Sequence, residues 1–127
     1  MTQVEVDVDL GWRFLSALGA RDYEELGDCF ADDGTLRAIV PSGLRDEDGR
    51  EGVVSRFRLW TGDIADYELL ETEVAEFGGL LKLRWVVSGV DPDPALGANV
   101  FEQTAYAEVA HGRIEHMRLA CSGHRAV

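Results

Sequence analysis

The spacing of the hydrophobic residues in this chain changes after Trp60, and that change restricts the fold more than any other feature. Before Trp60 most apolar residues recur every three or four positions, which is typical of amphipathic helices. From about Tyr67 onwards they tend to alternate with polar residues, which is typical of half-buried strands. Helices that come early and strands that come late predict an α+β fold, with a curved antiparallel sheet wrapped around the helices in a single domain over residues 1–127.

Two helices are predicted near the N-terminus. Asp9 is a candidate N-cap for the first, and residues 1–8 are expected to be extended or disordered. Asp22 opens a short second helix, because Glu25 follows three positions later in a capping-box pattern. Residues 31–34 are expected to end that helix in a turn.

Turn signals divide the rest of the chain. Gly78-Gly79 predicts a hairpin, and Asp91-Pro92-Asp93-Pro94 predicts a rigid break between strands. Between these signals we expect, in chain order, a strand over residues 35–40, a charged loop over 44–52, a helix over 50–60, and strands over 67–77, 81–87, 99–109 and 113–122.

The charge of the chain disfavours two classes of partner. Acidic residues outnumber basic ones 24 to 12, which gives a formal net charge of −12. Such a surface repels nucleic-acid phosphates and anionic membranes, so neither is expected as a partner. The N-terminus lacks the pattern of a signal peptide, and no stretch approaches the ~20 apolar residues of a membrane span. We therefore expect a cytoplasmic protein.

Cysteine spacing and glycine patterns predict neither a metal site nor a cofactor. Cys29 and Cys121 match no zinc or redox motif. Two reduced, mostly buried thiols are favoured, and a single disulfide between them is the alternative. No glycine-rich phosphate loop is present.

Several local motifs follow one another in an informative order. They are Phe14-Leu15-Ser16-Ala17-Leu18, Arg21-Asp22-Tyr23, Cys29-Phe30-Ala31-Asp32-Asp33-Gly34, Gly49-Arg50-Glu51-Gly52-Val53-Val54-Ser55-Arg56-Phe57, Glu102-Gln103 and Gly112-Arg113-Ile114-Glu115-His116. In this order they resemble the nuclear transport factor two-like superfamily, which includes ketosteroid isomerases and SnoaL-like polyketide cyclases. The resemblance implies a cone formed by the sheet and helices, with a central pocket at its open end. The fold hosts enzymes, binding proteins and assembly domains alike, so it does not by itself give the function.

The resemblance also argues against ketosteroid isomerase chemistry. Phe14 falls where the isomerases carry an oxyanion-donating tyrosine, and Ala38 where they carry the aspartate that shuttles the proton. Their second carboxylic acid falls near Ala105. Enolisation needs a base and an oxyanion donor, and phenylalanine and alanine supply neither.

The cyclases are a closer match at the last strand. Ile114-Glu115-His116 resembles their motif there, while their catalytic aspartate falls near Cys121 or Ser122. No Arg flanked by Asp partners, as in the family's epoxide hydrolases, is present.

Strand alternation and the family resemblance together predict the pocket wall. Leu83, Trp85 and Val87 share one strand face, which we place inward. An apolar, aromatic cavity suits a small apolar, aromatic or polyketide-like molecule. The alternative is that the same residues fill the cone as core. The predicted ligand-binding residues are Phe14, Phe57, Trp85, Met117, Leu119 and Cys121.

Three polar residues are candidates for catalysis. Gln103 alternates with Phe101 and Ala105, so its amide is expected to be buried and to contact either a ligand or a structural partner. His124 follows the last strand close to the expected pocket mouth, and Asp46 belongs to the charged loop that could overhang it.

The other histidines are weaker candidates. Alternation against Met117 places His116 on the strand face opposite the pocket, and His111 lies in a predicted turn.

These observations lead to one preferred function and two alternatives. The preferred function is that of a cofactor-free cyclase, isomerase or lyase of a biosynthetic pathway, which acts mainly by orienting its substrate. The alternatives are a non-catalytic binding protein and a dimerising assembly domain. A homodimer is predicted through the outer sheet face, which would carry Glu102, Thr104, Tyr106, Glu108, His116 and Arg118.

Overall fold

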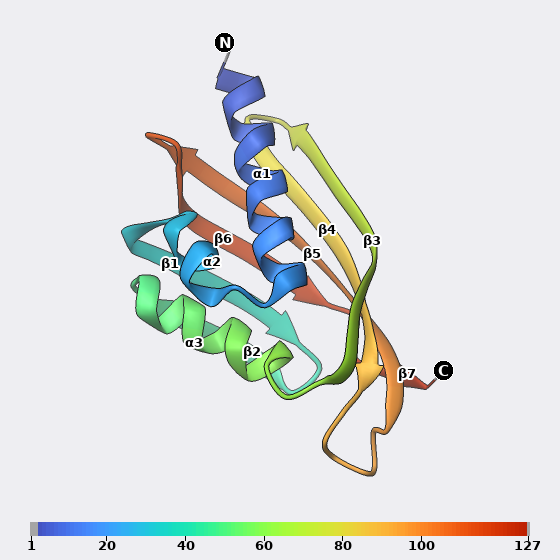
Figure 1. Cartoon of the computed structure of the whole chain (residues 1–127). Helices are drawn as coiled ribbons and strands as arrows, with labels where there is room; N and C mark the ends of the chain where they lie inside the picture. Colours follow the sequence, from blue (N-terminus) through green and yellow to red (C-terminus); the bar gives the residue numbers. More distant parts are fainter. Residues whose placement is uncertain (1–2, 127) are drawn as a thin grey trace.

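The computed structural model describes residues 3–126, which form helices on one face of a curved sheet (Figure 1). This arrangement confirms the predicted α+β class. The helices are α1 (Gln3–Ala20), α2 (Tyr23–Asp28) and α3 (Arg50–Thr61). The strands are β1 (Phe30–Val40), β2 (Gly43–Asp48), β3 (Ala65–Phe77), β4 (Leu80–Val90), β5 (Ala98–Ala110), β6 (Arg113–Cys121) and β7 (Arg125–Ala126).

The first helix starts earlier than the sequence predicted. Because α1 begins at Gln3, residues 3–8 are helical rather than extended, and Asp9 lies inside the helix rather than at its N-cap. The valines of this stretch are spaced at two and at four positions, so a run this short fits a strand and a helix equally well. Residues 1–2, which were expected to be extended or disordered too, lie outside the described residues.

The other two helices agree with their sequence signals. The side chain of Asp22 accepts a hydrogen bond from the Glu25 backbone N–H at 3.1 Å, which is the N-terminal half of the predicted capping box. Arg50, in the first turn of α3, donates to the Phe30 carbonyl at 2.9 Å and pairs with Asp32 at 2.7 Å. Within residues 3–126, no helix is both long enough and apolar enough to span a membrane.

The sheet is mixed rather than purely antiparallel as predicted. Its strand order is β2-β1-β6-β5-β4-β3, and β7 pairs with β5. The β1–β6 pair is parallel, whereas the other pairs are antiparallel. A parallel neighbour needs a long crossover connection, and here the chain between β1 and β6 passes through most of the sheet. Turn signals along the sequence carry no information about that pairing.

Two segments predicted as a turn and a loop belong to strands. β1 begins at Phe30, and its register with β6 shifts before Thr35, so residues 31–34 form an irregular stretch of strand rather than a turn. β2 occupies the predicted charged loop. Its charges lie on an edge strand, where charge is common because it discourages pairing with other chains.

Aromatic rings fill the interior of the cone. Trp85 on β4 and Phe14 on α1 are completely buried, with ring centroids 5.5 Å apart. Phe57 on α3 and Phe30 on β1 lie 5.6 and 6.1 Å from Phe14, both edge-to-face. We call these four residues the aromatic core. Rings at such distances leave no room for a ligand between them, because they already pack at the spacing that aromatic pairs prefer.

Glycine is required where α1 approaches the sheet. A Cβ on Gly11 would lie 2.7 Å from a methyl carbon of Val74 on β3. No larger residue allows this approach without a shift of the helix or of Val74. At the hairpin between β3 and β4, Gly78 and Gly79 have φ values of 57° and 82°, which confirms the predicted turn.

Candidate functional site

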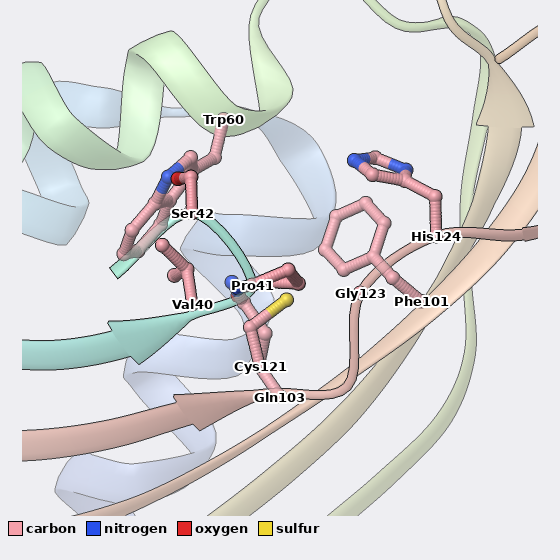
Figure 2. A pocket seen from close by; sticks show the side chains of 9 residues that line it. All are labelled: Val40, Pro41, Ser42, Trp60, Phe101, Gln103, Cys121, Gly123 and His124. Carbon is pink, nitrogen blue, oxygen red and sulfur yellow. The ribbon is translucent and has the colours of Figure 1, made fainter. Parts of the chain in front are cut away.

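A pocket of about 300 Å³ opens where β1 and β6 end (Figure 2). We call it the rim pocket. Its volume is at the lower end of the range for small-molecule sites, and most of its wall is apolar. The wall is formed by Val40, Pro41, Ser42, Trp60, Phe101, Gln103, Cys121, Gly123 and His124.

Gln103 forms the polar part of the pocket wall on β5. It lies between Trp85 on β4 and Cys121 on β6 in the sheet register, so the three side chains share one face. The Trp85 indole N–H donates to Gln103 Oε1 at 2.9 Å, which fixes the orientation of the amide. Within residues 3–126, Gln103 Nε2 has no hydrogen-bond partner. Its N–H groups are therefore available to a molecule in the rim pocket.

His124 is placed at the pocket edge by the turn after β6. Gly123 has a φ of 83°, and a Cβ there would lie 2.7 Å from Pro41, so the chain passes close to the β1–β2 turn only with glycine. The His124 ring packs edge-on against Phe101 at 5.1 Å between centroids. Its Nδ1 lies 2.8 Å from Asn99 Oδ1. In Figure 2 the ring reaches over Phe101 toward the side of the pocket where Trp60 lies.

The two cysteines are both free and lie in different environments. Cys121 is half-buried in the pocket wall. Cys29 is completely buried near α2, and burial raises the pKa of its thiol to about 11. Cys29 therefore stays protonated at neutral pH. Among residues 3–126, no His, Cys, Asp and Glu side chains form a group of three or more that could hold a metal ion.

The model of the SnoaL-like domain family matches residues 13–117. The chain belongs to the SnoaL-like domain family. The predicted resemblance to the nuclear transport factor two-like superfamily is thereby confirmed. The comparison with curated proteins gave no significant match.

Solved structures share the fold of this SnoaL-like domain at low sequence identity. A proposed polyketide cyclase from Xanthomonas campestris pv. campestris is 20% identical with a TM-score of 0.72, and the match covers 94% of this chain and 92% of that one. A proposed ketosteroid isomerase from Kribbella flavida is 18% identical with a TM-score of 0.69, over 100% and 85% of the two chains. An NTF2-like protein from Burkholderia xenovorans is 13% identical with a TM-score of 0.70, over 96% and 93%. At these identities the likeness concerns the fold alone.

The structure brings together only part of the site predicted from the sequence. Gln103, Cys121 and His124 line the rim pocket. The remaining residues predicted to bind a ligand are buried in the core and are not among the residues that line it; they are Phe14, Phe57, Trp85, Met117 and Leu119.

Asp46 lies on the outer side of the sheet, away from the rim pocket. On β2 its neighbours Arg45 and Glu47 are less exposed, and Glu47 pairs with Arg56 on α3 at 2.8 Å. Strand alternation therefore turns Asp46 to the opposite face, where it pairs with Arg37 at 2.9 Å. The Arg37 guanidinium lowers the pKa of the Asp46 carboxyl from its usual range. The expectation that Asp46 overhangs the pocket came from reading a strand as a loop.

Two of the residues that the family resemblance matches to reactive groups of the isomerases are buried and apolar in this chain. Phe14 is part of the aromatic core, and Ala38 on β1 is completely buried. His116 contacts Thr35 Oγ1 through Nδ1 at 2.5 Å, on the strand face opposite the buried Met117, as alternation predicts.

Sequence reasoning missed much of the pocket wall. Pro41 and Ser42 directly follow the predicted strand over residues 35–40, where no site residue was expected, and Trp60 was taken only as the end of the predicted helix over residues 50–60. Phe101 was placed on the same face as Gln103 but not assigned to the wall. That shared face was the one signal that could have found it.

Proposed function

We propose that this SnoaL-like domain binds a small, largely apolar or aromatic molecule in the rim pocket and converts it, as a cofactor-free cyclase, isomerase or lyase of a cytoplasmic biosynthetic pathway. The observation that carries the proposal is the Gln103 amide. It is a nearly completely buried polar group, 2% exposed, that lines an apolar pocket with its Nε2 unpaired within residues 3–126. Gln103 Nε2 itself is not buried, so in the rim pocket it can donate a hydrogen bond to water or, in its place, to an oxygen acceptor of a bound molecule.

The geometry supports catalysis by orientation. Trp85 fixes the Gln103 amide, so its N–H groups need no reorganisation to bind a carbonyl or alkoxide oxygen of the substrate. Apolar walls such as Phe101 and Trp60 restrict the remaining atoms of the substrate. His124, at the pocket edge, is the residue type best suited to move a proton near neutral pH.

The first experiment is to find the ligand. The protein is incubated with an extract of the producing organism and analysed by native mass spectrometry. A retained molecule whose structure differs from that of the free compound supports conversion; isomerisation leaves its mass unchanged, and elimination lowers it. Failure of any small molecule to bind, both here and in a fragment screen by ligand-observed NMR, contradicts the proposal.

The second experiment assigns the residues. With the substrate in hand, the Gln103→Ala/His124→Ala double variant is expected to lower turnover at least about tenfold, the size of a typical lost acid–base or oxyanion contribution. His111→Ala is the matched control, because His111 lies in the exposed β5–β6 turn. Unchanged turnover in the double variant contradicts the assignment.

A non-catalytic binding protein is the second candidate function. The observation that favours it is the loss of reactive groups inside the cone, where Phe14 and Ala38 offer neither a donor nor a base. Retention of the same molecule, chemically unchanged over long incubation, favours this function.

We also propose a homodimer through the outer face of the sheet. No helix among residues 3–126 covers that face in Figure 1, and an apolar groove there is lined by residues that include Ile39, Thr104 and Tyr106. Ile39 is 63% exposed, so it adds apolar area to this groove that a second copy would bury. Light scattering at micromolar concentration is expected to give twice the 14.0 kDa chain mass, and a 14.0 kDa particle contradicts the dimer.

A further inference from the structure

The amide of Asn99, at the start of β5, has a single consistent orientation. Its Nδ2 donates to the Gly97 carbonyl at 2.8 Å. The flipped amide would place two oxygens against each other at that distance, which is unfavourable. Asn99 is only 5% exposed, so neither group can turn to solvent instead. Its Oδ1 therefore faces His124.

This orientation determines which nitrogen of His124 carries the proton. Asn99 Oδ1 can only accept a hydrogen bond, and His124 Nδ1 lies 2.8 Å from it, so Nδ1 must donate. In a neutral imidazole the other nitrogen, Nε2, is then left with its lone pair. We propose that Asn99 is a positioning residue that holds His124 in the Nδ1–H tautomer, so that the rim pocket presents Nε2 as a hydrogen-bond acceptor and base.

The loop before β5 fixes the partner of Asn99. The Gly97 carbonyl also accepts from the Asp91 N–H at 2.9 Å, and the Gly97 N–H donates to the Asp93 carbonyl at 3.1 Å. The Asp91 side chain in turn accepts from the Asp93 N–H at 2.8 Å. These bonds hold the Gly97 carbonyl in place for the amide. The segment that the sequence marks only as a rigid break thus supports the edge of the pocket.

Two further features restrain the histidine, which is otherwise exposed to solvent. β7 pairs with β5 at Asn99 and Val100, which places the backbone that follows His124 beside Asn99. The edge-on contact with Phe101 fixes the plane of the ring. A ring restrained in this way can keep one tautomer without reorganisation.

Gln103 and His124 then have opposite hydrogen-bonding roles in the rim pocket. Gln103 offers N–H donors, and His124 offers an acceptor. This inference about the ligand rests on the proposed function. The combination of Gln103 and His124 selects an uncharged ligand with an oxygen acceptor for Gln103 and a hydroxyl, N–H or acidic C–H for His124.

The tautomer can be measured in the ligand-free protein. Two-bond ¹H–¹⁵N correlation spectra of the ¹⁵N-labelled full chain, recorded at about pH 9 where imidazoles are neutral, distinguish protonated from unprotonated ring nitrogens. The three histidines are assigned with His→Gln variants. For His124 we expect a protonated Nδ1 and an unprotonated Nε2. A dominant Nε2–H form in the wild-type chain overturns the proposal.

Two variants test whether Asn99 sets the tautomer. Asn99→Ala removes the acceptor, so the Nδ1–H preference of His124 should be lost. Asn99→Asp loses the donor to the Gly97 carbonyl and can turn in place, but it still offers an oxygen acceptor to His124, so Nδ1 should stay protonated. Unchanged His124 signals in Asn99→Ala, or a lost Nδ1–H signal in Asn99→Asp, overturn the proposal. His116, which contacts Thr35 instead, is the internal reference for intact folding. If Asn99→Ala does not fold, the wild-type and Asn99→Asp spectra decide.

The tautomer of His124 and the binding of a ligand are measured separately, so each proposal can fail without the other. A wild-type His124 in the Nδ1–H form together with no ligand in any binding experiment contradicts the proposed function alone. A bound ligand together with an Nε2–H histidine contradicts the positioning role of Asn99 alone.

Discussion

The interior of the cone and its rim are formed by the same strands, but the interior is filled by side chains whereas the rim contains a pocket. On β4 and β5 the inward positions run from the aromatic core to the rim pocket, with Trp85 and Gln103 as direct neighbours. Toward the interior, rings from α1 and α3 close over the sheet. At the rim, the turn at Pro41 and the glycine at position 123 approach each other closely, and the side chains of Trp60, Phe101 and His124 line an open pocket instead of filling it. The difference shows that aromatic residues on the same strands and helices fill the interior but leave space at the rim, where two turns end the packing.

The largest effect on stability is expected from Phe14→Ala in the aromatic core. Removing a completely buried ring from the aromatic core leaves a cavity, and such changes typically cost about 3–5 kcal/mol of unfolding free energy. Urea denaturation followed by circular dichroism measures the loss. Ser42→Ala in the exposed turn of the rim pocket is the control and is expected to cost under about 0.5 kcal/mol. A loss below about 1 kcal/mol for Phe14→Ala would mean that the interior is not tightly packed.

The next largest effect is expected in the reactivity of the two cysteines. Because burial raises the Cys29 pKa to about 11, only about one thiol in a thousand is ionised at pH 8, and the side chain is inaccessible as well. Cys121, half-buried at the rim, should react with a disulfide reagent roughly a hundred times faster or more. Timed labelling followed by peptide mapping measures both rates, with Cys121→Ser as the control. Equal rates would show that the interior opens as readily as the rim.

A smaller effect on stability is expected at the Trp85–Gln103 hydrogen bond, which joins the aromatic core to the rim pocket. Gln103→Leu leaves the buried indole N–H without a partner and is expected to cost about 1–3 kcal/mol. Trp85→Phe leaves the amide oxygen unpaired and adds the loss of packing from a smaller ring. In the double variant both polar groups are gone, so its loss of unfolding free energy should be clearly smaller than the sum of the single losses. Additive losses would mean that this hydrogen bond does not couple the two residues.

The regular parts of the fold could be predicted because their signals are local. The capping box at Asp22, the helical stripe over residues 50–60 and the hairpin at Gly78-Gly79 each depend on a few adjacent residues. Alternation also placed Gln103 on the inward face correctly. The parallel pairing of β1 with β6 depends on residues some eighty positions apart, and no local pattern encodes it.

The site was harder to predict than the fold because its position depends on what fills the cone. The sequence identified the inward aromatic residues, but whether they line a cavity or pack together depends on helix placement, for example on the close approach of α1 at Gly11. Asn99 gave no signal either, because its role arises from a loop carbonyl on one side and a histidine on the other. The placement of α1 and the contacts of Asn99 both depend on the folded structure, so no local sequence pattern indicates them.

The smallest effect is expected at Asp46. Because its segment is rich in charged residues, it was predicted to be a loop at the pocket mouth. Its ion pair with Arg37 is exposed on both sides, and exposed pairs contribute little. Because Arg37 lowers the Asp46 pKa, any stabilisation is fully present above an ordinary aspartate pKa of about 3.9 and is lost as the pH falls through the lower folded-state value. Asp46→Asn should therefore leave urea stability at pH 7 within experimental error. It should also leave ligand binding unchanged, whereas Cys121→Phe, which fills the rim pocket, should abolish it. A tenfold loss of ligand affinity in Asp46→Asn would show that the outer edge strand, and not only the rim pocket, contributes to the site.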